Sequence, residues 1–241
     1  MNEQSNDRNY YDQSSEAISL AELRRHCLIV NKYIVMYEPR LRKYAGKKSL
    51  RMLELGAGTC ATSLILSRSE GIGDIVCLDI SIKRMQTVFP LSVQAVGDCV
   101  PGKIRMVEGH FDARLPFGDE EFDVIVFDGA LHHARSMWFI LGECRRILRS
   151  EGLLIAQREQ YLGLVTASRK LKLLLRTPEV RAGVAENAYL RSQYWYYLRA
   201  AGFGTVKFLP VSESIVQSLV GVFNGLLYSK WVIWARSLPK V

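Results

Sequence analysis

Residues 53–61 decide the fold: Leu53-Glu54-Leu55-Gly56-Ala57-Gly58-Thr59-Cys60-Ala61 is typical of a buried strand that runs through a glycine turn into a helix. The two glycines let backbone N–H groups approach a ligand closely, because no side chain holds the ligand away. The same pattern fits a dinucleotide-binding turn. Asp79 ends the next predicted strand, 23 residues after Gly56, where a ribose-diol acceptor belongs for either kind of nucleotide cofactor.

The carboxylate of Glu54 separates two classes of cofactor. A dinucleotide places its pyrophosphate at this turn, where a neighbouring carboxylate repels it. S-adenosylmethionine places a cationic ammonium and a sulfonium there, which a carboxylate attracts. Glu54 therefore favours the cationic cofactor, although a salt-bridged strand end explains this residue equally well when it is considered alone.

Outside this segment, short apolar runs alternate with helix-like stretches. Helical patterns at 59–69, from 82 into the 90s and at 137–148 separate five runs bounded by Gly, Asp or Pro, namely 51–55, 74–79, 103–108, 122–128 and 152–157. This alternation predicts a doubly wound, Rossmann-like α/β fold. Two later runs, 205–209 and 229–238, predict an antiparallel hairpin at the sheet edge. We therefore expect seven mostly parallel strands with an antiparallel C-terminal strand.

The remaining segments predict additions to this sheet. Residues 1–16 are polar and look loose, and 19–46 has the apolar spacing of an amphipathic helix that is broken or kinked at Pro39. A further helix is predicted at 185–201, followed later by an apolar connection at 211–227. We expect one structural domain, with a leader and N-terminal cap helix in 1–48 and a cofactor-binding region in 49–241. The acceptor-side insertion lies at about 158–200.

Composition narrows the class of protein without selecting a partner. The chain has 241 residues, 49% of them hydrophobic, and a formal net charge of +8, which excludes a disordered chain and a small disulfide scaffold. Five cysteines without a Cys-x-x-Cys pair favour free thiols, and the polar N-terminus lacks the apolar centre of a secretory signal. Polar residues interrupt the apolar stretch 215–235, so no membrane span is expected. These observations predict a cytoplasmic protein.

Several motifs together resemble a known family. They are ELGAGT (54–59), Asp79, LPF (115–117) before EEFDVIVFDGALHH (120–133), and ECRRILRSEGLLIA (143–156). In order and spacing they resemble the class I S-adenosylmethionine-dependent methyltransferases, especially the branch that modifies small molecules. The resemblance implies an enzyme that methylates a small-molecule acceptor, a biosynthetic intermediate. Two departures are visible: Cys60 replaces a third glycine, and the acidic residue usual after the third strand is displaced.

The resemblance also implies roles for individual residues. Gly56, Ala57 and Gly58 would approach the methionine portion of the cofactor, with Glu54 near its ammonium. Asp79 would accept the ribose hydroxyls and Ile80 would pack against the adenine. Three residues compete for the position beside the adenine, namely His110, Phe111 and Asp112. Asp128 would lie near the transferred methyl group or the amino-acid portion of the cofactor.

His132 and His133 follow the fourth strand, at the edge of the sheet where ligands bind in open α/β folds. A histidine there titrates near neutrality and could accept the acceptor's proton. The alternative is that the pair shapes the pocket or caps the next helix. We expect no metal site, because adjacent histidines point apart on most backbones and no spaced third ligand is evident.

The sequence indicates less clearly which residues contact the methyl acceptor. Candidate residues are Tyr11, Arg158, Glu159 and Tyr194. The basic stretch 168–181 is compatible with an anionic acceptor, and equally with a solvated helix face. A homodimer is compatible with the sequence.

Two other functions remain as alternatives. The positive charge is compatible with an RNA-directed methyltransferase, but DGALHH lacks the Asn/Asp-Pro-Pro-aromatic pattern of base-amine enzymes, and no RNA-binding module is apparent, so nucleic acid is not the expected partner. The second alternative is a cofactor-binding protein without turnover. An NAD-dependent oxidoreductase ranks last, because of Glu54.

Overall fold

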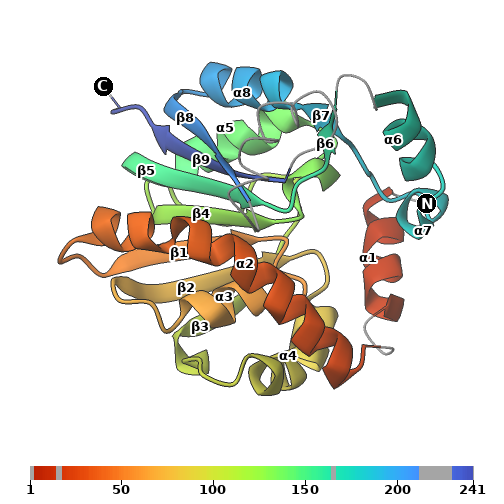
Figure 1. Ribbon diagram of the computed structural model, residues 1–241, viewed down its shortest axis with the longest axis horizontal. Helices are drawn as coiled ribbons and strands as arrows, with labels where there is room; N and C mark the ends of the chain where they lie inside the picture. The colour runs from red at the N-terminus through yellow and green to blue at the C-terminus, as the bar shows by residue number, and fades with distance from the viewer. Residues whose placement is uncertain (1–2, 15–17, 164–166, 212–229, 241) are drawn as a thin grey trace.

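The computed structural model describes residues 3–14, 18–163, 167–211 and 230–240. Its centre is a seven-stranded sheet in the order β3-β2-β1-β4-β5-β9-β8 (Figure 1). The strands are β1 (Leu50–Leu55), β2 (Ile72–Asp79), β3 (Ile104–Glu108), β4 (Phe122–Asp128), β5 (Leu148–Gln157), β8 (Phe203–Pro210) and β9 (Trp231–Ser237).

The pairing confirms the predicted sheet. Strand β1 is parallel to β2 and β4, and the pairs β2–β3 and β4–β5 are also parallel. Strand β9 lies between β5 and β8 and is antiparallel to both. Because β4 and β5 follow β1 on the other side from β2, the strand order reverses at β1, and a crevice opens at the carboxyl ends of these strands.

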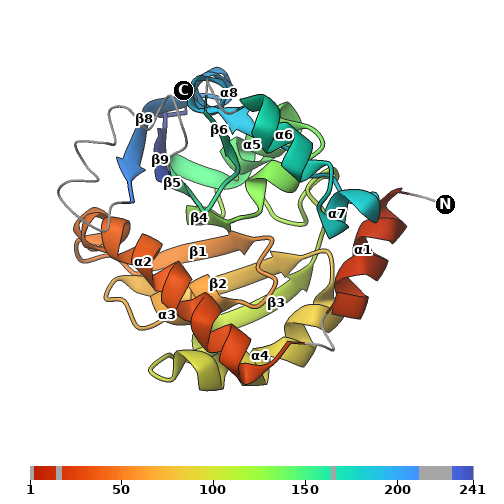
Figure 2. The same ribbon diagram turned by 45° about the vertical axis from the view of Figure 1, so that its right-hand side comes forward.

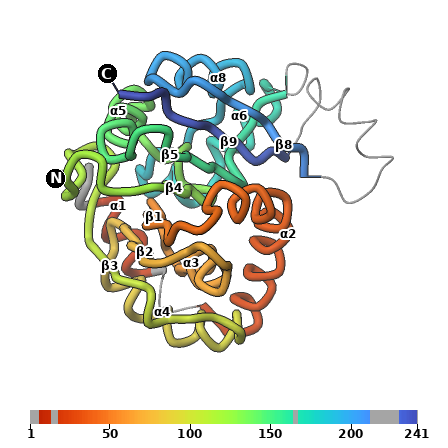
Figure 3. The backbone as a smooth tube through the Cα atoms, turned by 90° about the vertical axis from the view of Figure 1, so that its left-hand side faces the viewer, coloured from red at the N-terminus to blue at the C-terminus, as the bar shows by residue number. Residues whose placement is uncertain are grey.

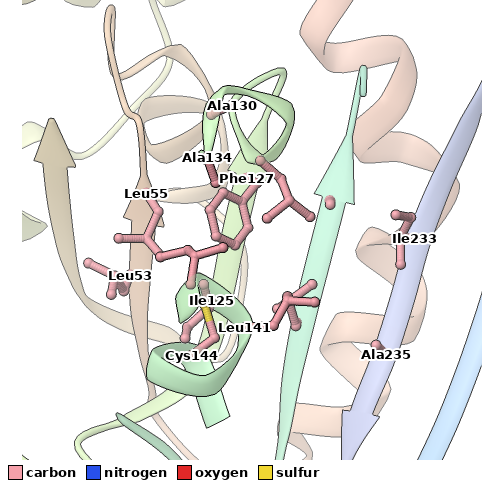
Figure 4. Packing of buried hydrophobic residues seen from close by; sticks show 14 of the residues in the cluster. Leu53, Leu55, Ile125, Phe127, Ala130, Ala134, Leu141, Cys144, Ile233 and Ala235 are labelled. Atoms are coloured by element: carbon pink, nitrogen blue, oxygen red, sulfur yellow. The ribbon is translucent and has the colours of Figure 1, made fainter. Parts of the chain in front are cut away.

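Helices cover both faces of the sheet (Figures 2 and 3). One face packs against α2 (Leu20–Ala45), α3 (Ala61–Leu66) and α4 (Ile82–Val96), and the other against α5 (Met137–Ile147) and α8 (Arg191–Ala200). Alternate residues of one strand serve the two cores, since Met52 belongs to the first and Leu53 to the second. In Figure 4, Leu141 and Cys144 of α5 face the apolar side chains of β1 and β4.

The remaining elements are short. Helices α6 (Ala167–Leu174) and α7 (Pro178–Arg181) follow β5, and a two-stranded parallel sheet joins β6 (Tyr161–Leu162) to β7 (Tyr189–Leu190). All five cysteines are free thiols, as predicted. Among the residues with described placement, no helix has the length and apolarity needed to cross a bilayer.

Two expectations about individual segments are wrong, and the break at Pro39, one of two alternatives, is excluded. The leader is not loose, because α1 (Glu3–Ser14) is a helix held by polar contacts: Asp7 pairs with Arg135, and Arg8 with Glu108. Helix α8 begins at Arg191 rather than 185, since the residues just before it pair with β6. Helix α2 runs through the exposed Pro39 without a break. The predicted connection at 211–227 lies almost wholly outside the described residues.

Candidate functional site

A cavity opens at the carboxyl ends of β1, β2 and β4. All ten residues predicted from the sequence to bind the cofactor line it. The sequence did not single out the other lining residues, apart from Tyr11, His133 and Arg158; they are Asp7, His26, Thr59, Arg84, Gly109, Gly129, Ala130 and Val184. The fold therefore brings the glycine turn, the end of β2 and the loops after β3 and β4 to one place.

The glycine turn has a backbone that only glycine satisfies at position 56. Gly56 has φ +72°, and a Cβ there would lie 2.6 Å from the Cβ of Ala130 and 2.9 Å from the Phe111 ring. The N–H groups of Gly56 and Ala57 both donate to the carbonyl of Leu78, at 2.8 and 3.1 Å, and this ties the turn to β2. The turn is thus fixed between two loops of the cavity.

Cys60 stands where the related pattern has a third glycine. It has φ +57°, in the left-handed region where glycine is favoured, and its side chain is completely buried at the start of α3. The departure is accommodated because the small thiol packs into the core.

Glu54 is buried beneath the turn and also lines the cavity. One of its carboxylate oxygens accepts the backbone N–H of Ser63 at 3.0 Å and the Ser63 hydroxyl. Burial raises the pKa of Glu54 to about 8. At neutral pH this carboxyl group is therefore mostly protonated, and an approaching cation favours its charged form.

Asp79 joins two loops through its carboxylate. One oxygen accepts the N–H of Gly58 at 2.8 Å, and the other accepts the N–H of Ser81 at 2.9 Å. Burial raises the pKa of Asp79, and these backbone donors oppose the rise. Each oxygen keeps a further lone pair, so the carboxylate can still accept two hydroxyl groups from a ligand.

The loop after β3 presents three candidates of different character. The Phe111 ring packs edge-to-face on Phe127, with ring centroids 5.9 Å apart, and supplies an apolar wall. Asp112 accepts the N–H of Arg135 at 3.0 Å, so its carboxylate is already engaged. His110 accepts the N–H of Asp112 through Nδ1 at 3.0 Å. Phe111 thus offers the surface that suits a flat aromatic ligand.

Helix α1 lies beyond the carboxyl ends of β1, β2 and β3 (Figure 2). Its Tyr11 lines the cavity, and the Arg84 guanidinium lies 5.3 Å from the Tyr11 ring centroid. Arg8 donates to the carbonyl of Ile80 at 3.3 Å. Tyr11, which was predicted for the substrate side, thus lines the same cavity as the residues predicted to bind the cofactor.

Asp128 and Arg158 form an ion pair at the ends of β4 and β5. Nε of Arg158 lies 2.5 Å from one oxygen of Asp128, and a terminal nitrogen lies 3.1 Å from the other. Thr62 also donates to Asp128 at 2.8 Å. Both members of the pair line the cofactor cavity.

A second cavity adjoins the first. Its lining consists of Gly129, His132, His133, Arg158, Gln160, Thr177, Glu179 and Glu186. Gly129, His133 and Arg158 line both cavities, so they form the wall between them. Half of the lining comes from residues 160–186, after the fifth strand of the sheet.

Glu159 lies behind this wall, completely buried as a side chain. It accepts the N–H groups of Ala130, Leu131 and His132, at 3.3, 3.2 and 3.0 Å, and its Oε2 lies 2.7 Å from Nδ1 of His132. The carboxylate therefore fixes the turn after β4 and orients one imidazole. It lines neither cavity, so the structure does not bring Glu159 to the predicted acceptor surface.

The two histidines lie side by side in a turn of 3₁₀ helix, with ring centroids 4.3 Å apart. Glu186 meets both: its oxygens lie 3.6 Å from Nε2 of His132 and 3.1 Å from Nδ1 of His133. Two premises of the expected absence of a metal site are therefore wrong, since the rings do not point apart and a third candidate ligand is present. The sequence does not indicate that Glu186 lies beside the histidines, because 53 residues separate it from His133.

Tyr194 lines neither of the two cavities. It is completely buried in the core, where its ring lies near those of Tyr161 and Tyr189, and its hydroxyl donates to the carbonyl of Gln160 at 3.3 Å. Its position supports the two-stranded sheet beneath the second cavity.

Comparison with known proteins adds to this geometry. Residues 53–156 match a family described as methyltransferase domain. Over 103 residues, the chain is 28% identical to a sarcosine/dimethylglycine N-methyltransferase from Aphanothece halophytica. That match covers 42% of this chain, which spans only 35% of the length of that relative.

Solved structures with the same fold include a putative sarcosine dimethylglycine methyltransferase from Galdieria sulphuraria, with a TM-score of 0.57, 18% identity and 85% of each chain covered. Another is a chain from the complex of the Haloferax volcanii Trm112 methyltransferase activator with a putative methyltransferase. Its TM-score is 0.58 at 18% identity, with 80% of this chain and 84% of that chain covered. At these identities the likeness concerns the fold.

Proposed function

Because residues 53–156 match a methyltransferase-domain family and the chain shares its fold with solved putative methyltransferases, we propose that the protein transfers a methyl group from S-adenosylmethionine to a small-molecule acceptor. The acceptor binds in the second cavity. The observation that carries this proposal is the shared wall, since Gly129, His133 and Arg158 line both cavities. Two ligands in these cavities lie against each other, as a direct transfer requires.

The residues of the first cavity fit S-adenosylmethionine. Glu54 is a buried carboxyl group that gains its charge from a cation such as the cofactor's ammonium. Asp79 has the free lone pairs for the ribose hydroxyls, and Phe111 offers an apolar surface for the adenine. A Cβ at Gly56 would fill the space between the turn and Ala130.

The bound cofactor supplies an activated methyl group on sulfur. In the transfer, the acceptor's lone pair forms the new bond to the methyl carbon, while the electrons of the broken carbon–sulfur bond stay on the neutral thioether. The acceptor must also lose a proton. His133 is the candidate base on the wall between the cavities, and burial together with neighbouring His132 lowers its pKa, which keeps its imidazole neutral.

The charges of the second cavity favour a neutral or cationic acceptor rather than an anionic one. Glu179 and Glu186 line it, whereas the guanidinium of Arg158 is already paired with Asp128. The basic stretch 168–181 contributes Thr177 and Glu179 to the lining but none of its arginines or lysines. Similarity to an N-methyltransferase named for sarcosine and dimethylglycine supports an amine.

We also propose that residues 158–200 form the acceptor-side insertion of one structural domain. Gln160, Thr177, Glu179 and Glu186 bring this segment to the second cavity. The segment begins directly after β5, at the same sheet edge as the glycine turn.

The test uses the purified chain with methyl-labelled S-adenosylmethionine and three acceptor pools: small amines, small hydroxylated compounds, and total RNA. We expect label in the amine or hydroxyl pool, and we expect Glu179→Gln to raise KM for the labelled acceptor while cofactor affinity stays unchanged. Label in RNA alone contradicts the proposal. Cofactor binding without transfer to any pool supports a binding protein without turnover instead.

A further inference from the structure

His132, His133 and Glu186 form a cluster of metal-ligand side chains at the second cavity, in which His133 acts as a ligand instead of the base considered above. One ring nitrogen of each histidine and one carboxylate oxygen of Glu186 all lie within 4.8 Å of one another. Two atoms that are each about 2.1 Å from one ion lie roughly 3–4 Å apart. The 3.6 Å separation of Glu186 from Nε2 of His132 falls in that range. Glu186 also lies 3.1 Å from Nδ1 of His133, but that nitrogen donates to the carbonyl of Ala185 at 2.7 Å, so His133 binds an ion either through Nε2 or by giving up this hydrogen bond.

Glu159 prepares His132 for this task. A carboxylate can only accept hydrogen bonds, so the 2.7 Å contact places the proton of His132 on Nδ1 and leaves a lone pair on Nε2. Nε2 is the atom that faces Glu186. Proteins commonly orient a metal-binding imidazole in this way, by a carboxylate that accepts the N–H on the side of the ring away from the metal. Glu159 has that position, and Glu186 lies on the opposite side as a candidate ligand.

Glu186 is a buried carboxyl group that faces both imidazoles. Its side chain is 6% exposed, and it accepts a hydrogen bond from Gln160 at 3.3 Å. A buried carboxylate is costly without a cation beside it, and a metal ion supplies one while leaving both imidazoles neutral.

We propose that His132, His133 and Glu186 bind a divalent first-row transition-metal ion, of the class of Zn²⁺, Fe²⁺ or Mn²⁺. Two imidazoles and one carboxylate suit these ions, and a site with three protein ligands keeps a position open for a substrate. The second cavity provides that position. Resting on the proposed function, the ion holds the hydroxyl or amine group of the acceptor beside the shared wall.

The experiment measures metal binding directly. The full chain is treated with a chelator, titrated with Co²⁺, and followed by the visible absorption of Co²⁺ bound to nitrogen and oxygen ligands. Zn²⁺ competition then gives its affinity, and Mg²⁺ serves as a hard-cation control. Three variants are compared with the wild type. Glu186→Gln removes a charged ligand, and Glu159→Gln removes the charge and one of the two acceptor oxygens behind His132. Glu179→Gln removes a carboxylate from the same cavity outside the cluster.

We expect one Co²⁺ per wild-type chain, displaced by Zn²⁺ but not by Mg²⁺. Glu186→Gln lowers the affinity at least about 100-fold, Glu159→Gln lowers it about 10–100-fold, and Glu179→Gln leaves it within a factor of about three. No stoichiometric Co²⁺ binding by the wild type overturns the proposal, and so does equal affinity in Glu186→Gln. Circular dichroism of each variant confirms that it is folded.

Parallel calorimetry with S-adenosylmethionine separates this proposal from the proposed function. A chelated chain that binds the cofactor and transfers methyl at the full rate, and that takes up no Co²⁺, overturns the metal site and leaves the methyltransferase function standing. A chain that binds Co²⁺ but no S-adenosylmethionine overturns the methyltransferase function and leaves the metal site standing. A transfer rate that falls with chelation and returns with Zn²⁺, Fe²⁺ or Mn²⁺ supports both.

Discussion

The two cavities are built in different ways, although they share a wall. The cofactor cavity rests on backbone geometry close to single strand ends: a turn with positive φ at Gly56, and Asp79 holding two backbone N–H groups. The second cavity rests on a network of buried side chains drawn from distant parts of the chain, centred on Glu159 and Glu186. The backbone alone can maintain the shape of a local turn. A network of side chains from distant parts of the chain keeps its shape only if every charged partner is present.

The sharpest way to break the second region is Glu159→Ala. This change leaves three buried N–H groups and the Nδ1–H of His132 without their acceptor. Removing one partner of a buried charged interaction costs about 3–5 kcal/mol, so we expect a loss of that size in the free energy of unfolding. Urea denaturation measures it. Glu143→Ala, which removes a partly exposed carboxylate from the surface of α5, is the matched control and should cost less than half as much. Equal losses would mean that Glu159 does not organise the turn.

The backbone-built region is broken most strongly by Gly56→Ala. The added Cβ meets Ala130 at 2.6 Å in a left-handed backbone, a strain of about 1–3 kcal/mol, and we expect cofactor affinity to fall about 10–100-fold or more. Gly58→Ala is the control, because its φ is also positive at +48° while nothing lies within 4 Å of the added atom. Calorimetry with S-adenosylmethionine should rank the two in that order, and the reverse order would refute the steric argument.

Asp79→Asn tests whether one side chain serves both the backbone and the ligand. The amide keeps one acceptor oxygen but loses the charge and presents a donor to a hydroxyl, so we expect cofactor affinity to fall about 10–100-fold, equivalent to about 1.5–3 kcal/mol. Asp123→Asn, at the opposite end of β4 and paired with Arg149, should leave affinity unchanged. An unaltered affinity in Asp79→Asn removes the ribose role of Asp79.

The smallest effect is a pH dependence centred on Glu54. Below pH 8 this buried carboxyl is mostly protonated in the free protein, and binding the cofactor's ammonium requires it to release that proton. Affinity should therefore fall as pH decreases below about 8, by at most tenfold per pH unit, and level off just above it. Calorimetry between pH 6 and 8.5 measures this slope, and Glu54→Gln should abolish it. A flat wild-type profile would place the ammonium elsewhere.

The difference between the regions also explains what the sequence could predict. Strand order, the glycine turn and Asp79 follow from local periodicity and spacing, so the sheet and the cofactor-side residues were predictable together. Helix α1 was missed because its sequence is polar and its stability comes from ion pairs with residues about 100 positions away. Glu186 and His26 were missed for a related reason, since neither has a neighbour in sequence that marks its role.

Helix α1 also constrains the order of events in folding. It precedes the sheet in the sequence, yet its partners lie at Ile80, Glu108 and Arg135, so these contacts form only when β2, β3 and the turn after β4 are in place. Its contacts are largely polar, which places it among the least protected parts of the native chain. We expect its amides to exchange hydrogen fastest among the helices that flank the cofactor cavity. We therefore expect α1 to complete the cavity last.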